Sequence, residues 1–219
     1  RERVVRAERR GPEPGAVDDL RRRLGLERDH RVVGFVGRLT RDKGVVELMA
    51  AFERVSGQLP SARLLIVGEF EEGDAVPAGT VARIRGHPAV VHAGFLEDPA
   101  PAYALMDVLA FPSHREGLPN VPLEAAAAGL PVVGFRATGT VDAVVDGVTG
   151  TLVDMGDAEG LAGAVVRYLK DGALRETHGE AGRARVATDF RPEDIREALR
   201  WEYDRLLGNG SARARRGAA

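Results

Sequence analysis

Residues 111–133 read FPSHREGLPNVPLEAAAAGLPVV. This segment is the most informative about the fold, because its pattern predicts a strand, a polar loop, a helix and a second strand in direct succession. Asn120 is a favourable N-cap, and Pro122 fits the first helical turn, where the amide that proline lacks has no partner. The four alanines of residues 125–128 favour a closely packed helix, and Gly129 is typical of a helix end. The stretch therefore predicts a unit of strand, helix and strand.

The same alternation extends in both directions from this unit. Short continuous apolar runs predict strands that are buried on both faces, and apolar residues at helical intervals predict the helices between them. Such alternation specifies an α/β fold, a Rossmann-like parallel sheet with helices on both faces, followed here by C-terminal helices. The expected strands are 32–36, 64–67, 90–93, 108–111, 131–135 and 151–153, and the expected helices are 16–24, 44–56 (ended by Gly57 and Pro60), 99–106, 121–128, 141–145, 158–170, 173–188 and 192–207.

Both ends of the chain differ in composition from the middle. Residues 1–14 are charged and broken by glycine and proline, which predicts a linker or a disordered start. Residues 15–207 are expected to form the single Rossmann-like domain, and residues 208–219 a disordered basic tail. The arginines near the start fit a solvated helix, so we expect no nucleic-acid partner. Because the chain starts with Arg1 and not with methionine, we expect it to be a processed or excised piece.

Composition narrows the class of protein. The chain has 219 residues, 44% of them hydrophobic, which is enough for the core of one domain. No run approaches the roughly 18 apolar residues of a membrane-spanning helix, and no secretory signal is present, so we expect a cytoplasmic protein. Cysteine is absent, which excludes disulfides, a thiol nucleophile and a thiolate metal site in this sequence.

Ligands of open parallel sheets bind beyond the carboxyl ends of the strands, so the loops that leave the strands are the candidate sites. The first, residues 37–44, contains Arg38 and Lys43 but has neither a dinucleotide fingerprint nor a P-loop. Of the 31 basic residues only Lys43 and Lys170 are lysine. Together with the N-terminus of the following helix, the loop could hold a diphosphate. The alternative is that its two cations are ordinary surface charges.

The loop of the opening stretch carries two carboxylates, Glu116 and Glu124, which could flank one cleft. Carboxylates accept hydrogen bonds from the hydroxyl pairs of ribose and hexose. The amides of Gly117, Leu118 and Val121 could face the same ligand. The alternative is a capped helix with a solvated glutamate in its first turn. The loops at 94–98 and 138–142 could also approach a ligand, although a structural turn is favoured for the second.

A series of short motifs occurs in order along residues 31–189. They are Phe35-Val36-Gly37-Arg38-Leu39 with Lys43-Gly44, Leu65-Ile66-Val67-Gly68, Ala93-Gly94-Phe95, Asp107-Val108, Pro112-Ser113, Glu116-Gly117, Glu124-Ala125, Gly129-Leu130-Pro131-Val132-Val133, Asp146-Gly147 and Gly150. In these motifs the sequence resembles the retaining glycosyltransferases of GT-B architecture, the group with capsule, lipopolysaccharide and sucrose-synthase-like enzymes. The chain would be the C-terminal, donor-binding half of that architecture.

The resemblance implies roles for individual residues. Arg38 and Lys43 would hold the donor diphosphate, and Glu116 with the amides after it would contact the donor sugar. Glu124 would bind the ribose and Leu96 would lie against the base. The implied catalytic residues are Glu116, Arg38 and Lys43, with no metal ligand and no cofactor. The full donor-binding set comprises Gly37, Arg38, Lys43, Leu96, Glu116, Gly117, Leu118, Asn120, Val121 and Glu124.

The resemblance also implies a reaction, the transfer of a hexose-type sugar from a nucleoside diphosphate sugar to an acceptor hydroxyl with retention. The acceptor, a sugar, lipid or glycan, would be held mainly by an N-terminal domain, so this fragment alone should be inactive. Peripheral contact of the full-length enzyme with the inner face of the membrane is left open. Two other functions stay open: a noncatalytic nucleotide-sugar-binding module, and a sugar-nucleotide epimerase of GT-B shape.

Overall fold

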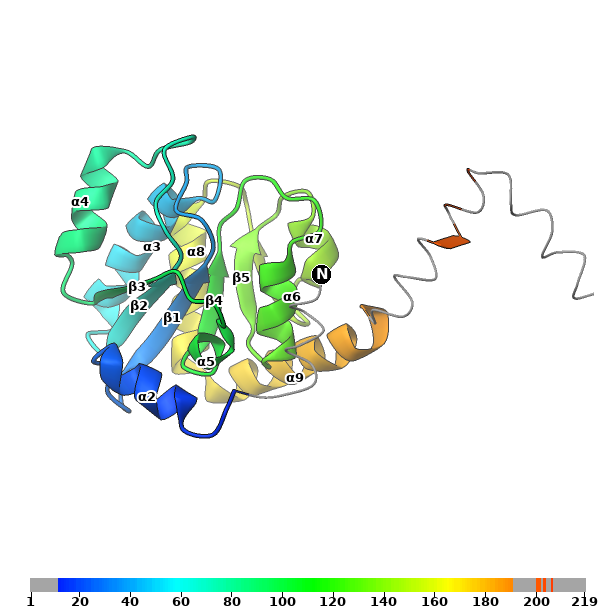
Figure 1. Cartoon of the computed structure of the whole chain (residues 1–219), viewed down its shortest axis with the longest axis horizontal. Helices are drawn as coiled ribbons and strands as arrows, with labels where there is room; N and C mark the ends of the chain where they lie inside the picture. Colours follow the sequence, from blue (N-terminus) through cyan, green and yellow to red (C-terminus); the bar gives the residue numbers. More distant parts are fainter. Residues whose placement is uncertain (1–11, 191–199, 202, 204–205, 207–219) are drawn as a thin grey trace, which may run out of the picture.

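A six-stranded, wholly parallel sheet forms the centre of the molecule, and the computed structural model describes residues 12–190, 200, 201, 203 and 206 (Figure 1). The strands lie in the order β3-β2-β1-β4-β5-β6. The order reverses between β1 and β4, and a reversal of this kind opens a crevice at the carboxyl ends of the strands. The strands are β1 (Arg31–Val36), β2 (Ala62–Val67), β3 (Val90–Gly94), β4 (Val108–Phe111), β5 (Val132–Phe135) and β6 (Gly150–Val153).

Helices cover both faces of this sheet, as the sequence predicts (Figure 1). One hydrophobic cluster contains side chains of α3, α4 and α8, and a second contains side chains of α2, α5, α6, α7 and α9. The first group is α3 (Val45–Gln58), α4 (Ala78–Gly86) and α8 (Ala158–Lys170); the second is α2 (Ala16–Arg23), α5 (Ala100–Tyr103), α6 (Asn120–Ala127), α7 (Thr140–Ala143) and α9 (Gly172–Asp189).

Strand β2 shows why the apolar runs become strands. Its side chains alternate between the two faces, so that Leu64 and Ile66 join one cluster while Leu65 and Val67 join the other. Leu64, Leu65 and Ile66 are fully buried. A strand that is buried on both sides needs no polar face, which explains the continuous apolar sequence.

The structure differs from the sequence-based elements in four places. Helix α4 was not predicted, because Thr80 and Ile84 are its only buried residues and a strong apolar stripe is absent. Gly57 lies inside α3, whose packing outweighs the low helix propensity of glycine. Asn120 is the first residue of α6 and not its N-cap, which is Pro119, and no side chain caps that end. The predicted helix 99–106 is shorter, at Ala100–Tyr103.

Other predictions fall outside the part of the chain that the structure describes. Residues 1–11 of the predicted linker 1–14, the whole predicted tail 208–219 and most of the predicted helix 192–207 lie outside the described residues. These three stay predictions. Among the described residues, no helix is both long and apolar enough to pass through a membrane.

Candidate functional site

The loops that leave β1 and β4 lie against each other where the strand order reverses. Gly44 ends the first loop with φ +69°, and a β-carbon there would lie 1.9 Å from the carbonyl oxygen of Pro112. The His114 amide donates to the Asp42 carbonyl at 2.9 Å, which joins the loops a second time. The predicted diphosphate loop and the predicted sugar loop are therefore one connected surface.

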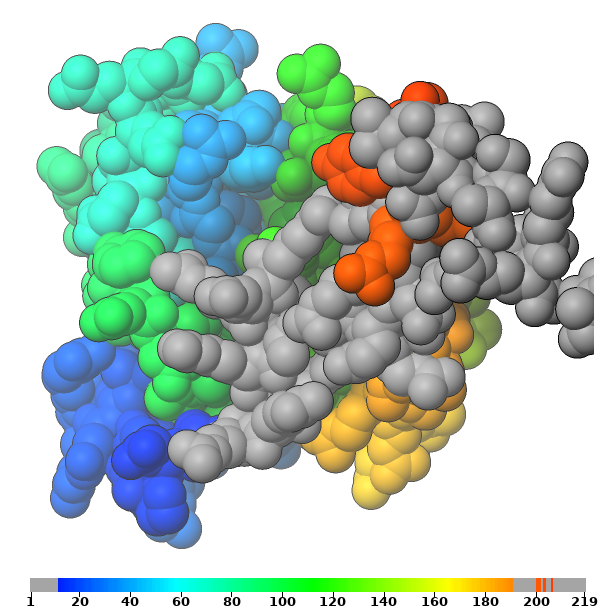
Figure 2. Space-filling view, turned by 45° about the vertical axis from the view of Figure 1, so that its right-hand side comes forward, coloured from blue at the N-terminus to red at the C-terminus, as the bar shows by residue number. Residues whose placement is uncertain are grey.

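The loop after β2 completes this surface, although it was not among the loops predicted to form the site. Its acidic residues bind the β1 loop: Asp74 Oδ2 accepts from the Asp42 amide at 2.7 Å, and Glu71 Oε2 accepts from Arg38 at 2.8 Å. In Figure 2 the light blue of the β1 loop lies against the teal of the segment after β2. The signal was available, because the acidic residues of 69–74 directly follow the predicted strand 64–67.

Glu116 is held by two donors that meet on one of its oxygens. The Lys43 ammonium and the Ser113 hydroxyl each lie 2.7 Å from Oε1. Lys43 and Glu116 are only 17% and 16% exposed, and Ser113 is buried. Within the described part of the chain, Oε2 of Glu116 makes no hydrogen bond. The side chain is thus fixed through one oxygen while the other is available to a ligand.

Arg38 and Lys43 are bridged by a shared carboxylate. Each has a nitrogen 3.8 Å from Oδ2 of Asp42, and Arg38 is also paired with Glu71. Burial raises the pKa of Asp42, but the Thr40 hydroxyl and the charges of Lys43 and Arg38 outweigh burial, so this pKa lies below its usual value. The hydrogen bond with Glu71 raises the pKa of Arg38. An anion that binds these two cations must therefore replace carboxylates that now contact them.

The loop after β5 supports the backbone beside Glu116. The Glu116 amide donates to the Thr138 carbonyl at 3.2 Å. Gly139 has φ +79°, and a β-carbon on it would lie 1.8 Å from the Gly117 carbonyl oxygen. The favoured interpretation of this loop as a structural turn agrees with these contacts. Gly117 and Leu118 are exposed residues, and their amides donate to no described residue.

Glu124 lies apart from this network and is not a solvated first-turn glutamate. It is only 9% exposed, and its Oε2 accepts a hydrogen bond of 2.8 Å from the buried hydroxyl of Tyr103 on α5. Burial, together with the charge of Glu124, raises the pKa of Tyr103 well above its usual value. Leu96 packs against the same hydrophobic cluster as Tyr103. The predicted base and ribose residues therefore share one face of the sheet.

The remaining predicted residues have simpler surroundings. Gly37 follows β1, and its carbonyl oxygen lies so close to Gly68 that a β-carbon on Gly68 would be 1.8 Å away. Asn120 is exposed and Val121 half-buried in the first turn of α6. His114 packs edge-on against Phe135, with ring centroids 5.7 Å apart. Its Nε2 lies 3.2 Å from Oε1 of Glu47, so His114 contacts α3 as well as the sheet.

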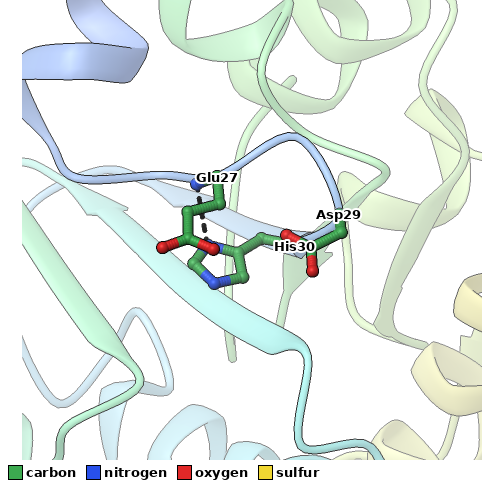
Figure 3. Close-up of side chains that lie close together, drawn as sticks. All are labelled: Glu27, Asp29 and His30. Carbon is green, nitrogen blue, oxygen red and sulfur yellow. Dashed lines mark hydrogen bonds between the residues drawn. The ribbon is translucent and has the colours of Figure 1, made fainter.

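One group of potential metal ligands occurs among the described residues, and it lies elsewhere. Glu27, Asp29 and His30 stand close together in the turn before β1 (Figure 3). This turn is at the amino end of β1, whereas the candidate site is at the carboxyl end. Nδ1 of His30 already accepts a hydrogen bond of 2.9 Å from the Glu27 amide. The cluster therefore has no part in the candidate site.

Known proteins resemble this chain in sequence. The family described as "Glycosyl transferases group 1" matches residues 30–171. The capsular polysaccharide biosynthesis glycosyltransferase CapM of Staphylococcus aureus is 36% identical over 182 residues, which make up 83% of this chain and 48% of the relative. The chain therefore spans about half the length of the curated relatives that it matches.

Solved structures share the fold. Alr3699/HepE of Anabaena, in complex with UDP and with UDP-glucose, superimposes with a TM-score of 0.75 at 28% identity, covering 85% of this chain and 53% of that one. Sucrose-phosphate synthase from Thermosynechococcus elongatus also gives a TM-score of 0.75, at 32% identity, covering 88% of this chain and 49% of that one.

Proposed function

The chain belongs to the group 1 glycosyl transferases, and from this premise we propose that it is the donor-binding half of a retaining, GT-B hexosyltransferase. One observation carries the proposal. Arg38, Asp42, Lys43, Glu116 and Ser113 form a continuous network at the carboxyl ends of β1 and β4. The network combines two cations with a carboxylate that has a free oxygen, which is what a sugar diphosphate requires.

The diphosphate lies against Arg38, Lys43 and the N-terminus of α3. This helix has 14 residues and begins directly after the β1 loop, so its free amides and dipole favour an anion there. As the bond from the sugar to the diphosphate breaks, negative charge develops on the leaving group. Preorganised cations stabilise that charge more than they stabilise the ground state. Arg38 and Lys43 thus fulfil the role that a metal ion has in other transferases.

Glu116 orients the donor sugar through Oε2, while Lys43 and Ser113 hold its Oε1. The acceptor oxygen forms the new bond to the anomeric carbon on the face from which the diphosphate departs. The electron pair of the broken bond leaves with the diphosphate, which also takes the acceptor proton. Attack on this face preserves the anomeric configuration.

UDP is the first nucleotide to test, since the Anabaena relative of similar fold was solved with UDP and with UDP-glucose. The relatives are about twice as long as the matched region, which supports an acceptor site outside this chain. We propose that the acceptor is held mainly there and that this chain alone transfers no sugar. Independence from metal, a cytoplasmic location and contact with a membrane stay predictions.

The experiment is calorimetric titration of the chain with UDP, GDP and ADP, each with and without a chelator. We expect weak binding of at least one of the three that the chelator leaves unchanged. No binding of any would contradict the donor site, and loss of binding with chelator would contradict metal independence. A noncatalytic module would bind equally well, so a longer protein that contains this chain must also release nucleotide from a nucleotide sugar when acceptor is present.

A further inference from the structure

The contact between Tyr103 and Glu124 joins two elements that are separate in the sequence. Tyr103 ends α5 and Glu124 lies in α6, and the hydroxyl of the first is 2.8 Å from Oε2 of the second. The two residues are 3% and 9% exposed. A buried carboxylate without a partner is costly, so this hydrogen bond decides how the Glu124 side chain is oriented.

The Tyr103 hydroxyl keeps its proton near neutral pH. Burial and the adjacent Glu124 raise the pKa of Tyr103 well above its usual value, which keeps the phenol protonated. In the structure the phenol donates and Oε2 of Glu124 accepts.

The second oxygen of Glu124, Oε1, can still accept a hydrogen bond. A carboxylate accepts hydrogen bonds on both oxygens, and in the described part of the chain Oε1 of Glu124 has no hydrogen-bond donor. Ribose offers two neighbouring hydroxyl donors, at its 2′ and 3′ positions. A 2′,3′-dideoxynucleotide has neither hydroxyl, although its base and phosphates are the same as those of the ribonucleotide.

We propose that Tyr103 is a positioning residue for the nucleoside subsite, because its hydroxyl holds Oε2 of Glu124 so that Oε1 meets the ribose hydroxyls of the donor. Tyr103 thereby sets the preference for ribonucleotides without touching the nucleotide itself. This inference rests on the proposed function, because it requires a nucleoside diphosphate at this site.

The test compares the affinities of UDP and 2′,3′-dideoxy-UDP for the wild-type chain and for Tyr103→Phe. The wild-type chain should prefer UDP by about tenfold or more, the size of one hydrogen bond to a charged group. Tyr103→Phe removes one oxygen atom and should bind UDP about tenfold more weakly, while its affinity for the dideoxy ligand changes less than about twofold. A role in stability alone would weaken both ligands equally.

Tyr168→Phe is the matched control. Tyr168 is also fully buried, and its hydroxyl lies 2.7 Å from Nδ1 of His178 and 3.1 Å from the Thr151 hydroxyl, between α8, α9 and β6. The chemical change is identical, but Glu124 is not affected. Tyr168→Phe should keep the full preference for UDP.

Glu124→Gln provides a second variant if Tyr103→Phe does not fold. It should lose the preference, and adding Tyr103→Phe should weaken UDP binding no further. Equal loss of both ligands in Tyr103→Phe, a full preference in Glu124→Gln, or no preference in the wild-type chain would each overturn the inference. Absence of any UDP binding by the wild-type chain would instead refute the proposed donor site, and the inference with it.

Discussion

Replacing Lys43 by methionine removes the cation of the proposed diphosphate site and keeps a straight side chain of similar length. Lys43 is 17% exposed, so its stem is mostly packed and a methionine can occupy the same space. The change leaves Glu116 with Ser113 as its remaining donor in the described chain. We expect folding to survive and nucleotide binding to suffer.

The magnitude follows from the contacts of the ammonium group. It has three donors, and one is used at 2.7 Å on Glu116. A hydrogen bond that involves a charged group contributes about 1.5 to 3 kcal/mol. Counting one such bond to a phosphate oxygen, UDP should bind about 10- to 150-fold more weakly. The unpaired charge of Glu116 would repel the diphosphate and add to this loss.

Calorimetric titration of UDP into wild type, Lys43→Met and Lys170→Met measures the effect. Lys170 is the exposed last residue of α8 and the only other lysine, so it controls for a change in net charge. Lys170→Met should bind UDP like wild type. Equal affinities of the Lys43 and Lys170 variants would mean that the β1 loop is a surface turn and that the diphosphate site is elsewhere.

Three further predictions concern the surroundings of the site and the fold. Gly44→Ala should lower the free energy of unfolding by about 1 to 3 kcal/mol and weaken UDP binding, because its β-carbon would meet Pro112 and its φ is +69°. Gly57→Ala is the control: it has open space around it, so it should raise the free energy of unfolding by up to about 1 kcal/mol in denaturant titrations. Glu71→Gln should strengthen UDP binding by up to about fivefold in calorimetry, because it frees Arg38 from an exposed ion pair. An unchanged or weaker affinity, or an equal gain in the control Glu72→Gln, would contradict this reason. Burial and the charge of Arg167 lower the pKa of His178, so the unfolded state binds a proton more readily and stability should fall as pH drops below about 6.5. His178→Gln should therefore make Tm depend less steeply on pH between 5 and 7. An unchanged dependence would mean that His178 is not its cause.

The sheet could be predicted from sequence because burial on both faces leaves a direct trace. Runs such as residues 64–67 are apolar without interruption, and α8 matches its predicted bounds of 158–170 because its apolar stripe is strong. Helix α4 has two buried residues and therefore left almost no periodic signal. Gly57 misled the prediction of the end of α3, since packing of the whole helix outweighs one unfavourable residue.

The site was predictable as a set of loops but not as a set of contacts. The order of strands and helices placed Arg38, Lys43 and Glu116 at one edge, and the structure brings Lys43 and Glu116 to 2.7 Å although 73 positions separate them. Asp42, Glu71 and Tyr103 were not assigned to the site, because each contacts a partner from another part of the chain. Ser113 was not assigned either, although its partner Glu116 is only three positions away. Such pairs depend on how loops meet in space, which local patterns do not encode.

The proposed function requires that a nucleoside diphosphate binds at the carboxyl ends of β1 and β4. Backbone amide shifts of the isotope-labelled chain, recorded while UDP is added, test it residue by residue. We expect the largest shifts at residues 37–44 and 116–121, with little change in the turn at Glu27–His30 at the opposite end of β1. Shifts concentrated in that turn, or no shifts at millimolar UDP, would contradict it.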